Sequence, residues 1–110
     1  MPVLKRIQVA THIAGLLGGA QYHLKPKGEL YHIHMTTLAG TTLLVSVRAS
    51  RQKTKTPNKF KAFDLYCLHK AVVDFQHGNP GAPVRAVTVM VKGSYIDCHI
   101  HEEYHQTDLP

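Results

Sequence analysis

The side chains with the clearest chemistry are basic and begin near the end of a run rich in β-branched residues, Thr41–Ala49. Six positive charges fall within fourteen positions, with no acidic residue before Asp64: Arg48, Arg51, Lys53, Lys55, Lys59 and Lys61. Such a segment is too polar for the core and too charged for a tight turn. Residues 50–59 are therefore predicted to protrude as a loop whose cations can contact a phosphate backbone. The alternative is a solvated loop that only keeps the protein soluble.

Aromatic side chains near this loop are suited to stack on nucleobases, and each stacked base contributes about 1–3 kcal/mol. The candidates are Tyr22, Tyr31, Phe60, Tyr66 and Tyr95. Not all of them can line one groove, and Tyr31 falls on an apolar face where packing in the core is the better interpretation. Lys92, close to Tyr95 in the chain, is a further candidate contact to phosphate.

Histidines offer a different chemistry, because nine of them occur in the chain. His32 with His34, and His99 with His101, form two His-x-His pairs on predicted strands. If the two hairpins are neighbours, four imidazoles could converge on zinc or copper. However, strand alternation puts any His-x-His pair on one side, so exposed sheet histidines are the preferred interpretation. We expect no metal or other cofactor.

Catalysis is not expected, because the serines and cysteines lie in no recognisable nucleophile motif and no phosphate-binding glycine loop occurs. The 110 residues fit one domain over residues 1–110, with a net charge of +6 that favours an acidic partner. Cys67 and Cys98 lie in apolar runs, which suggests buried thiols in a reducing, cytoplasmic setting. The sequence shows neither a membrane span nor a signal peptide.

The pattern of residues predicts strands joined by short turns, with one helix late in the chain. Strands are predicted at Val3–Ala10, Glu29–Thr36, Thr41–Ala49, Phe60–Cys67, Val84–Lys92 and Tyr95–His101. Three glycines in Thr11–Ala20 argue against a stable helix there. Leu68–His77 is predicted to be a short amphipathic helix ended by Gly78, and residues 102–110 a short polar tail.

Two hairpins have a register that the sequence defines. A three-residue loop ending at Gly40 and a tight type II′ turn at Gly93-Ser94 place apolar residues on one face and a His-x-His pair on the other. The predicted pairs are Met35 with Leu43, Ile33 with Val45, Tyr31 with Val47, Val91 with Ile96, Val89 with Cys98 and Val87 with Ile100.

This order of elements resembles the OB-fold, a five-stranded barrel with one helix between its third and fourth strands. The chain is similar to bacterial single-stranded DNA-binding proteins and to their short relative, the primosomal replication protein. The similarity lies in VLKRIQVATHIAGLL, FKAFDLYCLHKAVVDFQHG and VRAVTVMVKGSYID, and in a basic loop at the position of that family's protruding loop. The resemblance implies base stacking by Phe60 and Tyr66. The chain departs from that family in having no tryptophan and no acidic, Phe-tipped tail.

The sequence thus predicts an OB-fold-like five-stranded barrel, with another small α+β sheet as the alternative. The predicted function is binding of single-stranded nucleic acid, DNA rather than RNA, without sequence specificity and in support of replication, recombination or a mobile element. One alternative is a phage- or plasmid-encoded interaction module, and the other is a histidine-rich metal-binding protein. Open sheet edges lead us to expect a homodimer or homotetramer.

Overall fold

A computed structural model describes residues 3–50, 62–101 and 103–108, with side chains from residue 6 onward except at 103–106 and 108. Two helices and six strands follow one another as α1 (Val3–Leu17), β1 (Gly19–Leu24), β2 (Ile33–Thr37), β3 (Thr42–Ser50), α2 (Ala62–Gly78), β4 (Val84–Lys92), β5 (Tyr95–Ile100) and β6 (Glu103–Asp108). Within the described part of the chain, no helix is long and apolar enough to cross a bilayer.

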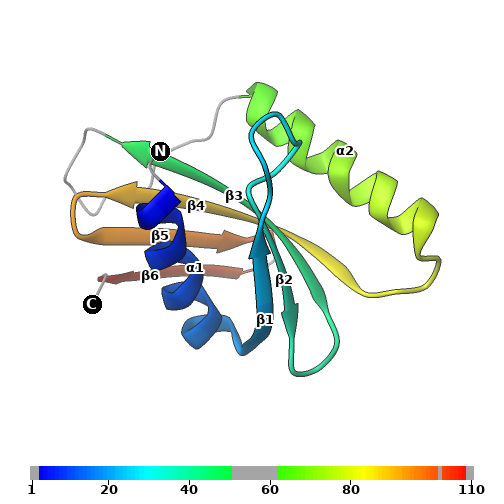
Figure 1. Cartoon of the computed structure of the whole chain (residues 1–110), viewed down its shortest axis with the longest axis horizontal. Coiled ribbons are helices and arrows are strands. Elements are labelled where there is room, and N and C mark those ends of the chain that lie inside the picture. The colour runs from blue at the N-terminus through cyan, green and yellow to red at the C-terminus, as the bar shows by residue number, and fades with distance from the viewer. Residues whose placement is uncertain (1–2, 51–61, 102, 109–110) are drawn as a thin grey trace.

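All six strands belong to one mixed sheet, in which the order in space equals the order in the chain (Figure 1). The central pair, β3 and β4, is parallel, and every other neighbouring pair is antiparallel. Parallel strands cannot be joined by a tight turn and need a crossover connection. The segment that contains α2 is that crossover.

The two helices pack on opposite faces of the sheet. Val9, Ala10 and Ile13 of α1 join the larger apolar cluster, together with alternate residues of β2 to β5 such as Val45 and Val89. Leu44, which points to the other face, packs with Leu68 and Ala71 of α2. Because both faces of β3 are covered, six of its nine residues are buried, including the small polar side chains of Thr42 and Ser46.

Helix α1 replaces the strand predicted over Val3–Ala10 and the turn predicted over Thr11–Ala20. Val9, Ala10 and Ile13 are fully buried, and Ala14 and Leu17 pack beside them, which is a helical spacing of apolar residues. Gly15 lies on the outer side of the helix, and Gly18 follows its end with a φ of 72°. Burial of this stripe outweighs the cost of about 1 kcal/mol for an interior glycine.

Helix α2 begins earlier than predicted. Its described residues include 62–67, so the strand predicted over Phe60–Cys67 is wrong there. The reason is that the buried stripe of Leu68 and Ala71 extends toward the N-terminus through Asp64, which faces the sheet. The predicted end is confirmed, since the helix stops at Gly78.

Both predicted hairpins are confirmed, with one exception in register. Ile33 pairs with Val45 and Met35 with Leu43, and all three predicted pairs of the β4–β5 hairpin form. Gly40 and Gly93 have φ values of 87° and 59°, as the predicted turns require. The Tyr31–Val47 pair does not appear in the ladder, because the side chain of His32 accepts the Val47 N–H instead.

The coarse prediction of a small, mostly β, α+β fold is confirmed, whereas the described residues form two helices and one six-stranded sheet in place of one helix and a five-stranded barrel. Residues 103–108 of the predicted tail form β6, which pairs along β5. The free edge of a strand offers backbone N–H and C=O groups to any segment that lies beside it, whatever its side chains. A polar segment can therefore still form a strand there. In the described part of the chain the sheet is open, with β1 and β6 at its edges, and closure into a barrel is not shown.

The buried face of α1 provides a test of this fold. Changing Ile13, which is fully buried, to Ala is expected to lower the free energy of unfolding by about 2–5 kcal/mol. The matched change Ile7→Ala, at a side chain that is 42% exposed, should cost less than about 1 kcal/mol. Urea denaturation followed by circular dichroism measures both. Equal effects of the two substitutions would contradict the observed orientation of α1.

Candidate nucleic-acid interface at the start of helix α2

The predicted site residues divide into three groups. Arg48 and Tyr66 lie near each other in the fold, on β3 and on the first two turns of α2. Lys92 and Tyr95 lie at the β4–β5 turn. The remaining candidates lie outside the described residues: Arg51, Lys53, Lys55, Lys59, Phe60 and Lys61. The structure therefore describes both ends of the basic segment, but not the segment itself.

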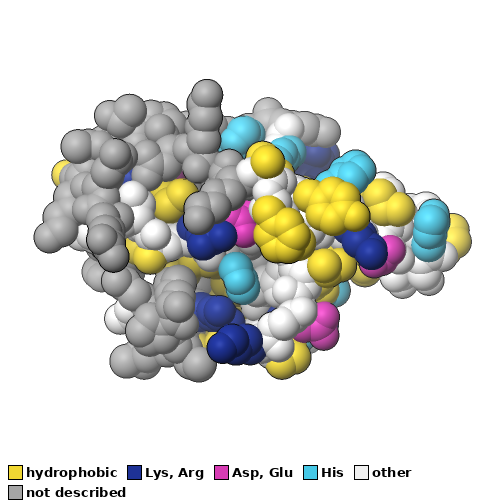
Figure 2. Space-filling view, turned by 90° about the horizontal axis from the view of Figure 1, so that it is seen from above, with side chains coloured by type: hydrophobic (Ala, Val, Ile, Leu, Met, Phe, Trp, Pro, Cys, Tyr) yellow, Lys and Arg dark blue, Asp and Glu magenta, His cyan; other side chains and the backbone are white. Residues whose placement is uncertain are grey.

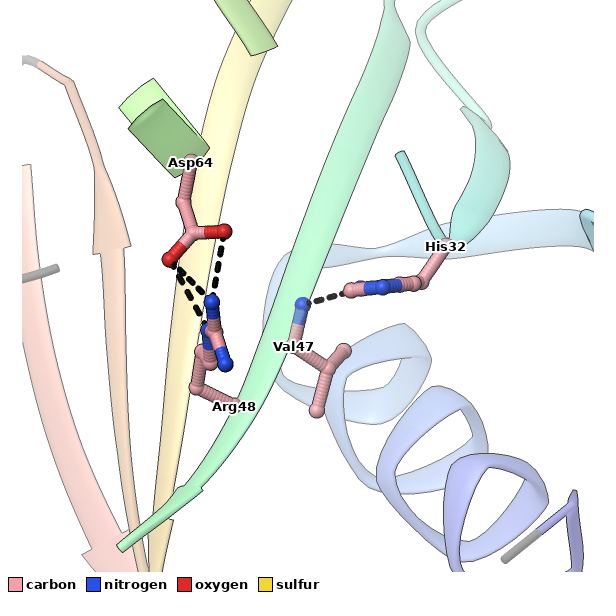
Figure 3. A network of polar contacts seen from close by, with 4 residues as sticks. All are labelled: His32, Val47, Arg48 and Asp64. Atoms are coloured by element: carbon pink, nitrogen blue, oxygen red, sulfur yellow. Dashed lines mark hydrogen bonds and ion pairs between the residues drawn. The ribbon is translucent and has the colours of Figure 1, made fainter. Parts of the chain in front are cut away.

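Arg48 and Asp64 form a two-point ion pair that joins β3 to α2 (Figure 3). Arg48 Nε donates to Asp64 Oδ2 and Nη2 donates to Oδ1, both at 2.8 Å. The Arg48 side chain is 42% exposed and that of Asp64 is 16% exposed. Asp64 also lies in the first helical turn, where a negative charge interacts favourably with the helix dipole. Because the guanidinium is partly in water, the pair adds little to stability.

Two large aromatic side chains extend into solvent next to this ion pair. Phe63 is 72% exposed and Tyr66 is 62% exposed. The spacing of three residues puts them on the outer side of α2, away from Leu68 and Ala71, and the exposed Lys70 continues the same row. Figure 2 shows hydrophobic, basic and histidine side chains gathered along this face. We call Phe63, Tyr66 and Lys70 the outer row.

The outer row was only partly predicted from the sequence. Tyr66 was a candidate, but Phe63 and Lys70 were not, because residues 60–67 were read as a strand in which alternate residues share a face. Helical spacing identifies the outer row. In a helix, positions 63, 66 and 70 share one side, whereas positions 64, 68, 71 and 75 lie on the other side. In a single helix that begins at Ala62, the side chains of Phe63, Tyr66 and Lys70 all lie on one face.

Lys92, predicted to contact phosphate, is instead fully buried. Its ammonium lies 2.6 Å from the carboxylate of Asp97, which is 4% exposed. Removing one partner of such a buried pair is strongly unfavourable, because the other charge stays in the interior without compensation. Lys92 therefore holds the β4–β5 hairpin together and presents no charge to solvent. Tyr95, the residue across the turn, is half-buried.

The tyrosines outside the outer row are engaged within the fold. Tyr31 was expected on the apolar face of Ile33 and Met35, but it is half-buried on the opposite face, where it packs against the cluster of Leu44 and α2. Its hydroxyl lies 3.0 Å from His34 Nδ1, and burial raises the pKa of Tyr31. Tyr22 is 37% exposed and its hydroxyl lies 3.1 Å from Thr11 Oγ1 on α1. Neither residue belongs to the outer row.

The two predicted His-x-His pairs, His32 with His34 and His99 with His101, do not converge on one site. His34 on β2 stacks on His23 with ring centroids 4.8 Å apart, and His99 stacks on His101 at 5.0 Å. Strands β3 and β4 separate the two pairs, although both face the side that α2 covers. Among the described residues, no group of three or more His, Cys, Asp or Glu side chains is arranged to hold a metal ion.

The cysteines are also separate from the outer row. Both thiols are free, and Cys98 is buried on β5. Burial raises the pKa of Cys98 to about 12, so this thiol is protonated and a poor nucleophile at neutral pH. Cys67 is only half-buried and lies on α2, not on a strand as predicted.

Comparison of the chain with protein-family models, with curated proteins and with solved structures finds no match. The resemblance to single-stranded DNA-binding proteins therefore stays a prediction. Any functional proposal has to come from the residues and their geometry.

His32 fixes the edge of β3 next to the ion pair. The strand β2 begins at Ile33, and just before it His32 Nδ1 accepts the backbone N–H of Val47 at 2.8 Å (Figure 3). This bond requires Nδ1 to be unprotonated. Desolvation by burial, followed by the nearby charge of Arg6, lowers the pKa of His32 below its ordinary value. His32 thus favours the neutral form that the bond needs.

Stability should therefore fall as the solution becomes acidic. Because the pKa of His32 is lower in the folded chain, the unfolded chain binds more protons just below the ordinary value of about 6.5. The contribution of His32 is complete above that pH and decreases as the pH falls toward the folded pKa. Substituting His32 by Ala leaves a buried N–H unpaired, and is expected to cost about 1–3 kcal/mol at pH 7.

The measurement is urea denaturation at intervals between pH 7 and pH 5. The His32→Ala variant should show a shallower pH dependence than the wild type, with the remainder due to His34 and His101, whose pKa values burial also lowers. Leu38→Ala supplies the control, since it removes a non-titrating side chain that is 85% exposed and should keep the wild-type dependence. A wild-type stability that is constant over this range would contradict the role given to His32.

Proposed function

We propose that the protein binds single-stranded nucleic acid, DNA in the first place, along the outer row of α2. The observation that carries the proposal is the exposure of Phe63 and Tyr66, at helical spacing, directly after the basic segment of the chain. Neighbouring exposed apolar side chains on one face are typical of an interaction site, whereas single exposed hydrophobic residues are common. Lys70 adds a positive charge to the same row.

The preference for single strands follows from the chemistry of stacking. In a duplex both faces of each base are covered by neighbouring bases, whereas an unpaired base can stack on an aromatic ring. Stacking does not depend on which base is present, so little sequence specificity is expected. The proposal needs an exposed aromatic row and nearby cations, and it is independent of whether the sheet closes into a barrel.

The positive charge of the protein also favours nucleic acid as the ligand. Five basic residues lie between Arg51 and Lys61, immediately before α2 in the chain, and the net charge of the protein is +6. Lysine and arginine attract the phosphate backbone and release its counterions, which makes affinity depend strongly on salt. The basic residues would hold the backbone while Phe63 and Tyr66 contact the bases.

The test is a fluorescence-anisotropy titration of labelled oligo-dT at low and at physiological salt, with a DNA duplex for comparison. We expect the single strand to bind more tightly than the duplex and to weaken as salt rises. Phe63→Ala and Tyr66→Ala should each cost about 1–3 kcal/mol of binding free energy. The protein-interaction alternative is favoured if the wild type does not bind oligo-dT even at low salt.

A matched control is available at the opposite end of the sheet. The β2–β3 turn lies away from α2 (Figure 1), and Leu38 in this turn is 85% exposed. Leu38→Ala removes a similarly exposed apolar side chain and should leave the affinity for oligo-dT unchanged. If the Leu38 and Tyr66 variants bind equally well, the outer row is not the binding surface.

A further inference from the structure

The ion pair of Arg48 with Asp64 has a consequence for nucleic-acid binding, which rests on the function proposed above. Asp64 follows Phe63 directly in the chain, and its carboxylate lies on the side of α2 that faces β3. It is the only acidic residue between Glu29 and Asp74, a stretch that otherwise carries only positive charge. Its position in a cationic region is therefore exceptional.

Asp64 engages the guanidinium of Arg48 in the way that a phosphate group would. Two nitrogens of Arg48, Nε and Nη2, each donate to a separate carboxylate oxygen at 2.8 Å. Carboxylate and phosphate both accept this paired geometry from arginine. The guanidinium also remains partly in water, with 42% of the Arg48 side chain exposed, so an incoming phosphate can reach it.

We propose that Asp64 acts as an internal competitor for phosphate. In the free protein its carboxylate occupies the donors of Arg48, and binding of nucleic acid exchanges that carboxylate for a backbone phosphate. The exchange requires no change in the path of β3 or α2, because only the ends of two side chains move. Asp64 thereby lowers the affinity of the protein for nucleic acid. In addition, Arg48 becomes available only to ligands that carry a phosphate group at this position.

The opposite role for Asp64 makes the opposite prediction. If the carboxylate instead holds Arg48 in the orientation that phosphate requires, its removal should weaken binding. If the ion pair is purely structural, removing its charge should change affinity no more than removing another acidic residue of the same helix. Asp74 is such a residue, since it is exposed and lies further along α2.

The experiment compares Asp64→Asn with Asp74→Asn in the oligo-dT titration at low salt. Both variants raise the net charge by one, so general electrostatic attraction increases equally. We expect Asp64→Asn to bind roughly threefold to fivefold more tightly than Asp74→Asn, in keeping with the strength of a partly exposed ion pair. The gain should disappear when Arg48→Gln is added, because the freed guanidinium is then absent.

The outcomes are distinguishable. Failure of the wild type to bind oligo-dT overturns the proposed function, whereas a wild type that binds and an Asp64→Asn variant that gains nothing over Asp74→Asn overturn the competitor role alone. Thermal unfolding checks that each variant is folded. If Asp64→Asn is not, Asp64→Ser takes its place, because serine also removes the charge and is well tolerated at the start of a helix.

Discussion

The parallel pairing of β3 with β4 is the constraint on which the rest of the structure depends. Nine consecutive residue pairs form this ladder, from Thr42 with Val84 to Ser50 with Lys92. Because parallel strands need a crossover, the chain between them has to leave one end of the sheet and return to the other. That path brings the first turn of α2 beside Arg48, and it is the reason why the Arg48–Asp64 ion pair exists.

The two faces of the sheet differ in chemistry as a result. The face under α1 is an apolar cluster, whereas the face under α2 combines a small apolar cluster with buried polar groups such as Ser46, Thr88 and the Lys92–Asp97 pair. On the α2 side, the exposed aromatic side chains of Phe63 and Tyr66 lie on the same helix as the exposed Lys70. The proposed binding surface and the competing carboxylate of Asp64 both follow from this asymmetry.

The antiparallel hairpins could be predicted from the sequence because strand alternation is local and a one-residue shift would bury histidines. The helices were harder. The β-branched residues of α1 and the glycines beside them favour other structures, and only burial against the sheet, a long-range effect, makes them helical. The pairing of β3 with β4 has no local signal at all. Of the candidate site, Arg48 and Tyr66 were named from the sequence, and the cations of residues 51–61 lie outside the described residues. The exposure of Phe63 and Lys70 on one helix face and the burial of Lys92 depended on the helix and on tertiary structure.

We propose that nucleic acid contacts the exposed side of α2. A titration of ¹⁵N-labelled protein with oligo-dT, followed by two-dimensional NMR, locates the contact directly. We expect the largest chemical-shift changes in the backbone amides of Phe63, Tyr66 and Lys70, with the exposed side of α1 unaffected. Changes confined to α1 or to the β2–β3 turn, with α2 unperturbed, would contradict it.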